Sequence, residues 1–162
     1  VETASEELLK RHHKNTRIDQ IQTAFKLCEE VGIRTLAHFI FGLPGETIES
    51  MRRTIDFSIE LDPFFASFNM AAPRWGTDLR EESIREGWIT DPYADVDNSL
   101  SIPLLQTDDL DPAEIVQFRN KAVKAFYLRP AYLVKRLRYL RSLYEFQTLF
   151  MEGFDYLHSK VK

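Results

Sequence analysis

The sequence contains a single cysteine, Cys28, and no apolar run that approaches the roughly 20 residues needed to cross a bilayer. One cysteine excludes an internal disulfide and cannot by itself build a thiolate metal site. No set of histidines, cysteines or carboxylates has the spacing of metal ligands. The opening residues, VETASEELLK, lack the charged-then-apolar order of a secretory leader. We therefore expect a soluble, cytoplasmic protein with no membrane span and no metal ligands, and, because it begins with Val1 rather than methionine, part of a longer polypeptide.

Patterns for binding phosphate or coating nucleic acid are also missing. The chain has neither a P-loop nor a G-x-G-x-x-G phrase. Its net charge of -4 argues against a protein whose main role is to coat nucleic acid. What the chain does have is 162 residues, 44% of them hydrophobic, which is enough for one ordinary globular core. We expect one domain with an appendage.

The first half of the chain alternates between helical and strand patterns. Apolar residues recur at spacings of three and four over 18–31 and 48–59, as on one face of a helix, while 33–41 and 66–72 are short apolar runs. Together with a helix over 78–86, this order predicts an α/β fold with parallel strands. The 33–41 run lacks sustained alternation, which is typical of a strand covered on both faces.

The histidines and the cysteine are interpreted within this scheme. His38 lies inside the 33–41 strand and is expected to be a hydrogen-bonded core residue. His12 and His13 lie among charged residues and are expected to face water. Cys28 falls on the apolar side of its helix and is expected in the core.

Two similar turns follow the predicted strands. Leu43–Thr47 (LPGET) and Pro73–Thr77 (PRWGT) each place Pro, then Gly, then Thr before a helix, and Val1–Ser5 has the pattern of a still earlier strand end with Ser5 as a helix cap. Ligands of α/β folds bind at the carboxyl ends of the strands, so we expect these turns to lie together there. Gly42 would let a ligand approach the backbone, although GLPG also suits a simple strand-to-helix connection.

The second of these turns carries candidate substrate-binding residues. Arg74 and Trp75 place a cation and a large aromatic ring on a loop at the end of a strand. Such a pair can line a substrate pocket.

The second half of the chain has a different character. Residues 91–110 are polar, with prolines and clustered aspartates, and predict an extended linker or loop. Asp111 followed by Pro112 is a typical helix start, and apolar stripes then predict two or three amphipathic helices over 111–162. The basic residues of these helices favour a solvated face, or else contact with a tetrapyrrole carboxylate, RNA or a membrane surface. They are Arg129, Lys135, Arg136, Arg138 and Arg141.

Three phrases in the first half resemble motifs of radical S-adenosylmethionine (SAM) enzymes. FIFGLPGETIES, from residue 39, is similar to the family's fifth-strand motif. VETASEELLKRHHK at the start is similar to the fourth-strand stretch, and PRWGTDL to the sixth-strand phrase. The resemblance covers roughly residues 1–90. Further on, RNKAVKAFYLRPAYLVKRL resembles the helical tail of the branch that carries a cobalamin-binding domain upstream, which includes the anaerobic magnesium-protoporphyrin monomethyl ester cyclase type.

The resemblance implies that 1–90 is the carboxyl-terminal portion of a partial (β/α)6 barrel, with a linker over 91–110 and a helical region over 111–162. It implies S-adenosylmethionine and a 4Fe-4S cluster as cofactors, with cobalamin in an upstream domain as an option. It also implies a role for particular residues in holding the S-adenosylmethionine. Glu2 and Ser5 would contact its ribose or methionine moiety, Lys14 its carboxylate, Ile40 and Gly42 its adenine, and Glu46 would orient the turn.

The departures from the family pattern matter as much. The C-x3-C-x2-C run that holds the cluster and the second-strand Gly-Gly-Glu phrase are both absent. We expect them before Val1, so this chain alone would hold no cluster and no catalytic residue. Its first partner would be the amino-terminal half of the same polypeptide, its second a small-molecule substrate. A sheet cut at an internal strand exposes an unpaired edge, and we therefore expect the isolated fragment to self-associate.

The resemblance leaves several functions open. The full protein would be an iron-sulfur oxidoreductase or methyltransferase, with a tetrapyrrole as one substrate option. A tRNA methylthiotransferase is a rival, although such proteins usually end in a β-rich RNA-binding domain and this tail has a helical pattern. A non-enzymatic α/β module that binds a nucleotide or a partner is the alternative from a different class, and it rests on the architecture alone.

Overall fold

The computed structural model describes residues 1–89, 105–107 and 109–139. By its internal contacts the chain divides into two compact units, Val1–Phe126 and Tyr127–Lys162, which are described separately here. The predictions for 90–104 and 140–162 lie outside the described residues.

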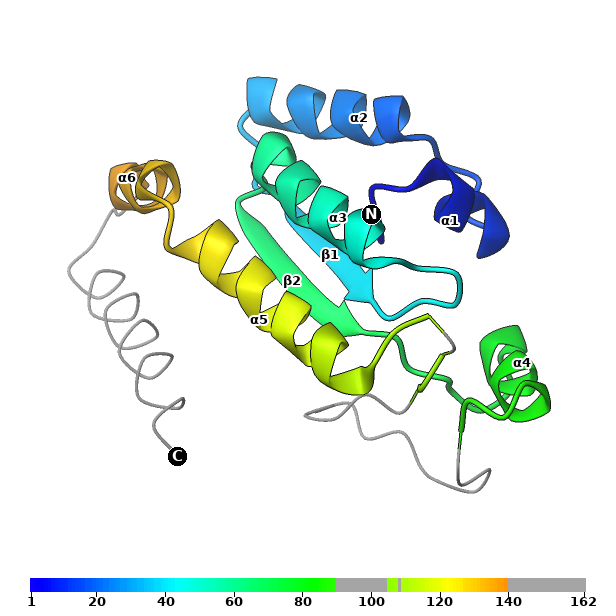
Figure 1. Cartoon of the computed structure of the whole chain (residues 1–162). Helices are drawn as coiled ribbons and strands as arrows, with labels where there is room; N and C mark the ends of the chain where they lie inside the picture. Colours follow the sequence, from blue (N-terminus) through cyan, green and yellow to red (C-terminus); the bar gives the residue numbers. More distant parts are fainter. Residues whose placement is uncertain (90–104, 108, 140–162) are drawn as a thin grey trace. The chain divides into compact units, whose positions relative to one another are not determined.

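The first unit has the predicted α/β architecture, built on two parallel strands (Figure 1). Strand β1 pairs with β2 in a register that joins Leu36 to Phe65 and Phe41 to Met70. Helix α3 makes the crossover between them, as predicted for parallel neighbours. The elements, in order, are α1 (Glu6–Arg11), α2 (Ile18–Glu30), β1 (Leu36–Phe41), α3 (Ile48–Leu61), β2 (Phe65–Met70), α4 (Asp78–Arg85), α5 (Pro112–Tyr127) and α6 (Pro130–Arg138).

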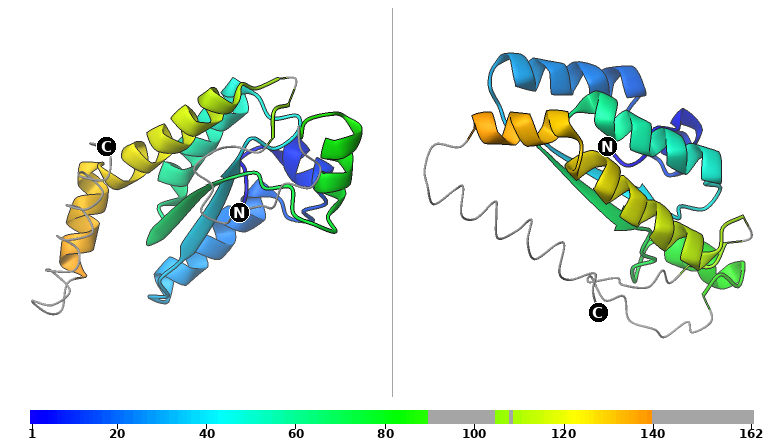
Figure 2. Two further views of the ribbon diagram at one scale, coloured as in Figure 1. Left: turned by 90° about the horizontal axis from the view of Figure 1, so that it is seen from below. Right: turned by 60° about the vertical axis from the view of Figure 1, so that its left-hand side comes forward.

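One face of the sheet forms the core of the first unit, beneath α3 and α5 (Figures 1 and 2). The rings of Phe39 and Phe68 stack across the two strands with centroids 5.3 Å apart, and Phe126 of α5 meets Phe68 edge-on at 6.0 Å. Such aromatic pairs stabilise a core by about 0.5–1.5 kcal/mol beyond the burial of their area. The core-facing residues of the strands are Ala37, Phe39, Phe41, Ala66, Phe68 and Met70.

The other face of the sheet is largely uncovered by the described residues, which corrects the expectation of a strand buried on both sides. Leu36 and Phe65 at its amino end are 52% and 41% exposed. His38 is exposed too, so the prediction that it is a core residue is wrong. Burial alternates along both strands because the helices pack against one face only. We call this surface the open face; it consists of Leu36, His38, Ile40, Phe65, Ser67 and Asn69.

The first residues of the chain lie beside β1, as predicted for the end of an earlier strand. The backbone N–H of Ile40 donates to the carbonyl oxygen of Glu2 at 2.9 Å. Thr3 is buried, and its hydroxyl lies 3.2 Å from that of Thr54 on α3. Thr54 also accepts a hydrogen bond from the N–H of Ala4 at 3.1 Å. These bonds attach residues 2–4 to both the sheet and its covering helix.

The helices begin where the sequence predicts. Ser5, Thr47 and Thr77 each accept a hydrogen bond from the backbone N–H three residues later, at the starts of α1, α3 and α4. Asp111 makes the reciprocal side-chain and backbone bonds expected at the start of α5. Local hydrogen bonding therefore fixes these boundaries.

Helix α2 is less buried than its apolar pattern predicts. Ile21 is buried, but Phe25 and Cys28 are only half-buried and Val31 at the C-cap is 71% exposed. The expectation that Cys28 lies in the core is therefore too strong.

Helix α5 belongs by its contacts to the first unit. The sequence pattern instead predicts that residues 111–162, which include α5, form a separate helical region. The difference arises because the apolar stripe of α5 packs against the sheet, through Ile115 and Phe126 among others.

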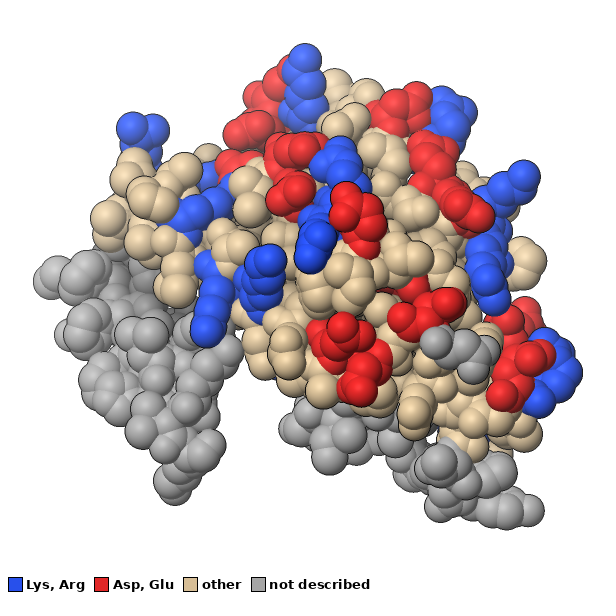
Figure 3. All heavy atoms as spheres, viewed as in Figure 1, with Lys and Arg blue, Asp and Glu red and all other residues tan. Residues whose placement is uncertain are grey.

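The described part of the second unit contains helix α6. Pro130 occupies the first turn of α6, where proline is favoured. The rings of Tyr127 and Tyr132 meet edge-on with centroids 5.1 Å apart. No helix of the described residues is long and apolar enough to cross a membrane. On the face shown in Figure 3, acidic and basic side chains are interspersed.

Candidate functional site

The ends of β1 and β2 and the first residues of the chain lie next to one another at the carboxyl edge of the sheet. Glu2 pairs with Ile40 near the end of β1, and the N–H of Ala71, just after β2, donates to the carbonyl oxygen of Phe41 at 2.8 Å. The turns that follow these strand ends therefore begin at one edge, as the sequence predicted. In parallel α/β folds this edge is where ligands bind.

The turn after β1 is held by the carboxylate of Glu46. One carboxylate oxygen, Oε2, accepts the backbone N–H of Gly42 at 2.6 Å and that of Leu43 at 3.3 Å. The N–H of Glu46 donates in turn to the carbonyl oxygen of Leu43 at 2.9 Å. Glu46 thus orients this turn, and its carboxylate points at the backbone of its own loop.

Glu46 is an unusual carboxylate because it is fully buried. Burial raises its pKa from 4.5 to about 7, although the two backbone hydrogen bonds act in the opposite direction. Its second oxygen, Oε1, has no hydrogen-bond partner among the described residues. Near neutral pH the side chain is therefore poised between its neutral and charged forms.

Gly42 has a packing role that the sequence did not indicate. Its φ of 80° lies in the left-handed region, and a Cβ at this position would come within 2.8 Å of Cδ1 of Ile115. The space that a side chain at this position would occupy is thus taken by α5. Gly45 also has a positive φ, 82°.

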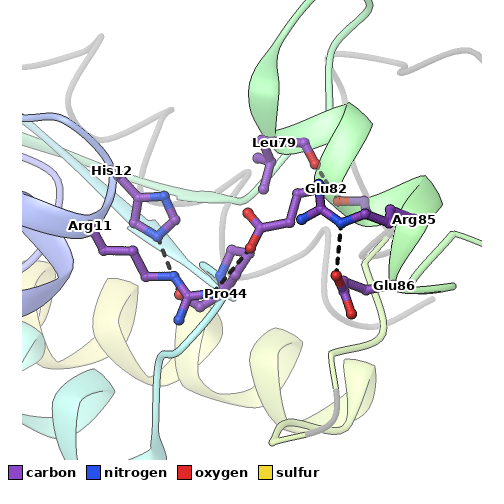
Figure 4. Close-up of polar contacts among 8 residues, drawn as sticks. Arg11, His12, Pro44, Leu79, Glu82, Arg85 and Glu86 are labelled. Atoms are coloured by element: carbon purple, nitrogen blue, oxygen red, sulfur yellow. Dashed lines mark hydrogen bonds and ion pairs between the residues drawn. The ribbon is translucent and has the colours of Figure 1, made fainter.

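Side chains from α1 and α4 clamp the same turn (Figure 4). Arg11, at the end of α1, forms an ion pair with Glu82 of α4 at 3.1 Å, and its guanidinium fills the space beside Gly45. The Nε2 atom of His12 lies 3.2 Å from the carbonyl oxygen of Pro44. These contacts join α1 and α4 to the turn after β1, and we call them the α1–α4 clamp.

His12 does not face water as predicted. It is half-buried against the turn, and this burial is the main cause that lowers its pKa below 6.5. The hydrogen bond to Pro44 acts in the opposite direction. His12 is therefore mainly neutral at pH 7, while His13 is exposed as expected.

The residues predicted to contact S-adenosylmethionine occupy this edge in different ways. Glu2 and Lys14 form an ion pair at 2.8 Å with both side chains partly exposed. The hydroxyl of Ser5 caps α1. Ile40 lies on the open face, where it packs partly against an apolar cluster whose buried members are Leu43, Ala71, Ile89 and Leu105.

The predicted substrate residues lie on the turn after β2. Arg74 and Trp75 are both exposed, Trp75 by 57%. One face of the indole is covered by the guanidinium of Arg80, whose Cζ atom lies 3.6 Å from the ring centroid. Arg80 is itself buried and donates to the carbonyl oxygen of Pro73 at 2.9 Å. The indole of Trp75 therefore packs with one face against the guanidinium of Arg80.

Sequence reasoning missed Arg11, His12, Glu82 and Arg80. No local pattern marks these residues, because each acts on a partner in another turn or helix. The only available signal was their place: Arg11 and His12 precede Lys14 in the stretch that resembles the fourth-strand motif.

Comparisons with known proteins agree with the geometry. Residues 1–58 match the family model of the Radical SAM superfamily. The chain is 32% identical over 139 residues to an uncharacterized methyltransferase of Pyrococcus horikoshii, an alignment that covers 83% of this chain and 29% of that protein. It is 27% identical over 132 residues to the anaerobic magnesium-protoporphyrin IX monomethyl ester cyclase of Rubrivivax gelatinosus, covering 82% and 23%.

A third relative is the cytidylyl-2-hydroxyethylphosphonate methyltransferase of Streptomyces wedmorensis, 32% identical over 95 residues, which covers 55% of this chain and 17% of that protein. The chain spans less than a third of the length of each of these relatives.

Proposed function

Because residues 1–58 belong to the radical SAM superfamily, we propose that this chain is the carboxyl-terminal portion of the partial barrel of a radical SAM methyltransferase and forms part of its S-adenosylmethionine site. The observation that carries the proposal is the meeting of the first residues of the chain, at Glu2, with the ends of β1 and β2, at Phe41 and Ala71, along one edge of the sheet. The superfamily match includes two of the three turns that begin there.

The residues at this edge fit S-adenosylmethionine. Ile40 offers a half-buried apolar surface that suits the adenine ring. The paired carboxylate of Glu2 and ammonium of Lys14 are partly exposed and suit the ribose hydroxyls and the methionyl carboxylate. Glu46 would act indirectly, because its carboxylate binds the backbone of the turn rather than facing the ligand. When bound, S-adenosylmethionine supplies a methyl group and a 5'-deoxyadenosyl group.

An iron-sulfur cluster does not fit the residues of this chain. The superfamily implies a 4Fe-4S cluster, and such clusters are held by several cysteine thiolates. The sequence has one cysteine, Cys28, and the described residues contain no group of three side chains able to hold a metal ion. We therefore assign this chain to the S-adenosylmethionine and substrate sides of the site, with the cluster ligands supplied by other residues of the polypeptide.

Methyl transfer is the reaction class that the relatives favour, because two of the three named above are methyltransferases. The second candidate is an oxidative cyclisation of the kind named for the Rubrivivax gelatinosus relative, whose alignment covers 82% of this chain. In either case the exposed residues of the turn after β2, Arg74 and Trp75, would face the substrate.

The test uses the natural polypeptide that contains this chain, reconstituted with iron and sulfide without oxygen. We expect it to bind S-adenosylmethionine and, with a reductant, to form 5'-deoxyadenosine, measured by mass spectrometry. Ile40→Asp should raise the Kd for S-adenosylmethionine by at least about tenfold, because it places a carboxylate against an apolar ring.

The matched control is Leu36→Asp, on the same face of the same strand but at its other end. This variant should bind S-adenosylmethionine like the wild type. A polypeptide that forms no 5'-deoxyadenosine overturns the proposed function, and an equal loss of affinity in both variants overturns the assignment of Ile40.

A further inference from the structure

We propose that His38, Ser67 and Asn69, on the open face of the sheet, hydrogen-bond a neutral polar group of an amphipathic small-molecule substrate. The inference rests on the proposed function, because it places the substrate next to the residues assigned to S-adenosylmethionine. It adds three residues, one of which the sequence had placed in the core.

The open face is continuous with the cofactor edge. Ile40 belongs to both, since its side chain points to the open face while its backbone pairs with Glu2. His38 precedes Ile40 by two residues and points to the same side, roughly 7 Å away along the strand. A molecule lying on the open face would therefore abut a ligand bound at Ile40.

The polar residues of this face are only partly engaged in hydrogen bonds within the fold. His38 lies opposite Ser67 in the strand register, and Asn69 lies opposite Ile40. The Ser67 hydroxyl donates to Oδ1 of Asn69 at 3.2 Å, and Nδ2 of Asn69 donates to the carbonyl oxygen of Phe39 at 3.5 Å. No described residue hydrogen-bonds to the imidazole of His38. Asparagine is also depleted in β-strands, where β-branched and aromatic residues pack better. Donors and acceptors are thus presented on a surface that the helices leave uncovered.

The rest of the face indicates the class of substrate. Leu36 and Phe65 form an apolar pair at the amino end of the open face, beside the polar residues. None of the six residues is an aspartate, glutamate, lysine or arginine. A phosphate or carboxylate would therefore meet no fixed cation here, whereas a carbonyl, amide or hydroxyl on an apolar body would match the pattern.

The alternation of the strands allows a direct test by thiol labelling. In the natural polypeptide, His38→Cys and Ser67→Cys place thiols on the open face, while Ala37→Cys and Ala66→Cys place them one residue away on the buried face. The tryptic peptides 35–52 and 54–74 contain no native cysteine, so labelling by N-ethylmaleimide can be read by mass spectrometry at each position. Thermal unfolding by circular dichroism verifies that each variant is folded.

We expect the open-face thiols to react at least about tenfold faster than their buried neighbours, because a buried thiol reacts only after local opening. Saturating S-adenosylmethionine should slow the labelling of His38→Cys several-fold and leave Asp56→Cys, on the exposed side of α3, unaffected. Among small probes of equal size, millimolar benzamide should protect His38→Cys and benzoate should not.

Each outcome decides the inference. If the wild type cleaves S-adenosylmethionine but position 38 labels as slowly as position 37, other parts of the polypeptide cover the open face and the inference is overturned while the proposed function stands. A labelling rate of His38→Cys that does not change when S-adenosylmethionine is added also overturns the inference. Protection by benzoate alone, or by neither probe, overturns the substrate class. If the wild type does not bind S-adenosylmethionine, the proposed function fails and this inference fails with it.

Discussion

The turns after β1 and β2 have similar sequences, LPGET and PRWGT, but the structure uses them differently. The first is enclosed: Glu46 binds its backbone from within and Arg11 fills the space beside Gly45. The second is open, with Trp75 57% exposed and no atom within 4 Å of a Cβ built on Gly76. A shared Pro-Gly-Thr pattern therefore predicts the helix start in both, while the surroundings decide how firmly each turn is held.

This difference suits a site with one constant and one variable ligand. A turn tied to the rest of the fold by several contacts holds a single geometry, as binding of the same cofactor in every reaction requires. A turn whose side chains project into solvent can differ in shape without disturbing the core. We therefore interpret the first turn as the support for S-adenosylmethionine and the second as part of the substrate side.

The largest expected effect comes from adding one methyl group to each turn. Gly42→Ala should lower the free energy of unfolding by about 3–4 kcal/mol, because it adds a strained positive φ to a clash with Ile115. At Gly76 the φ is 75° but no atom lies close to the added methyl group. Gly76→Ala should therefore lower the free energy of unfolding by the backbone strain alone, about 1–2 kcal/mol. Urea denaturation measures both.

The pair Gly42→Ala with Ile115→Ala provides the control. Truncation of Ile115 removes the atom that the new methyl group would meet, so the double variant should be more stable than the sum of the two losses predicts. Equal losses at Gly42 and Gly76 would show that the first turn is no more tightly packed than the second.

The buried carboxylate of Glu46 should make the stability of the first turn depend on pH. Its pKa is about 7 in the folded chain against 4.5 when unfolded, so the folded state binds the extra proton between these values. The stabilisation is complete below pH 4.5 and is lost as the pH rises through 7. By linkage the loss amounts to about 3 kcal/mol. Glu46→Gln, which keeps an acceptor for Gly42, should remove it.

Denaturation at pH 5.5 and pH 8 compares wild type and variant directly. The difference between the two pH values should be smaller in Glu46→Gln than in the wild type. His12 works in the opposite direction, because its lowered pKa costs stability as the pH falls below 6.5, and it is present in both proteins. The same pH difference in both would mean that Glu46 is charged in the fold at pH 5.5.

The features that sequence reasoning predicted well are those with local causes. Ser5, Thr47 and Thr77 cap helices because a side chain bonds to an N–H three residues away, which sequence spacing reveals. The parallel pairing of β1 and β2 follows from the strand–helix–strand order, and with it the meeting of the turns at one edge.

The features that it missed depend on distant residues. Arg11 and Glu82 are 71 positions apart, and no local pattern indicates that α1 and α4 flank the same turn. The exposure of His38 was hidden because an apolar run reads alike whether one face or both are covered. Likewise, the reason for Gly42 is Ile115, on a helix that sequence reasoning assigned to another region.

A smaller effect is expected from the α1–α4 clamp. The Arg11–Glu82 ion pair is partly exposed, so Arg11→Ala should cost less than about 1 kcal/mol of stability. Because the guanidinium also packs beside Gly45, we expect the Kd for S-adenosylmethionine in the natural polypeptide to rise several-fold. Arg85→Ala removes a neighbouring pair, Arg85–Glu86, that does not reach the turn, and should change neither quantity (Figure 4).

Charge exchange separates the ion pair from simple truncation. Arg11→Glu alone should weaken binding more than Arg11→Ala, and adding Glu82→Arg should restore part of the affinity. If the exchange restores nothing, the guanidinium acts on the turn by packing rather than through Glu82. An unchanged Kd in Arg11→Ala would show that the clamp does not shape the cofactor edge.

The smallest effect on stability is expected at Trp75, on the open turn. Its indole stacks on the guanidinium of Arg80 but is 57% exposed, and exposed cation–π contacts contribute about 0.5–1 kcal/mol. Trp75→Ala should therefore lower the free energy of unfolding by less than about 1 kcal/mol, and Trp75→Phe by less still, since the phenyl ring keeps a face over Arg80. The affinity for S-adenosylmethionine should stay at the wild-type value in both. If Trp75→Ala instead destabilises the fold as much as Gly42→Ala, the second turn is held as firmly as the first, and the division of the site into a fixed cofactor side and an adaptable substrate side fails.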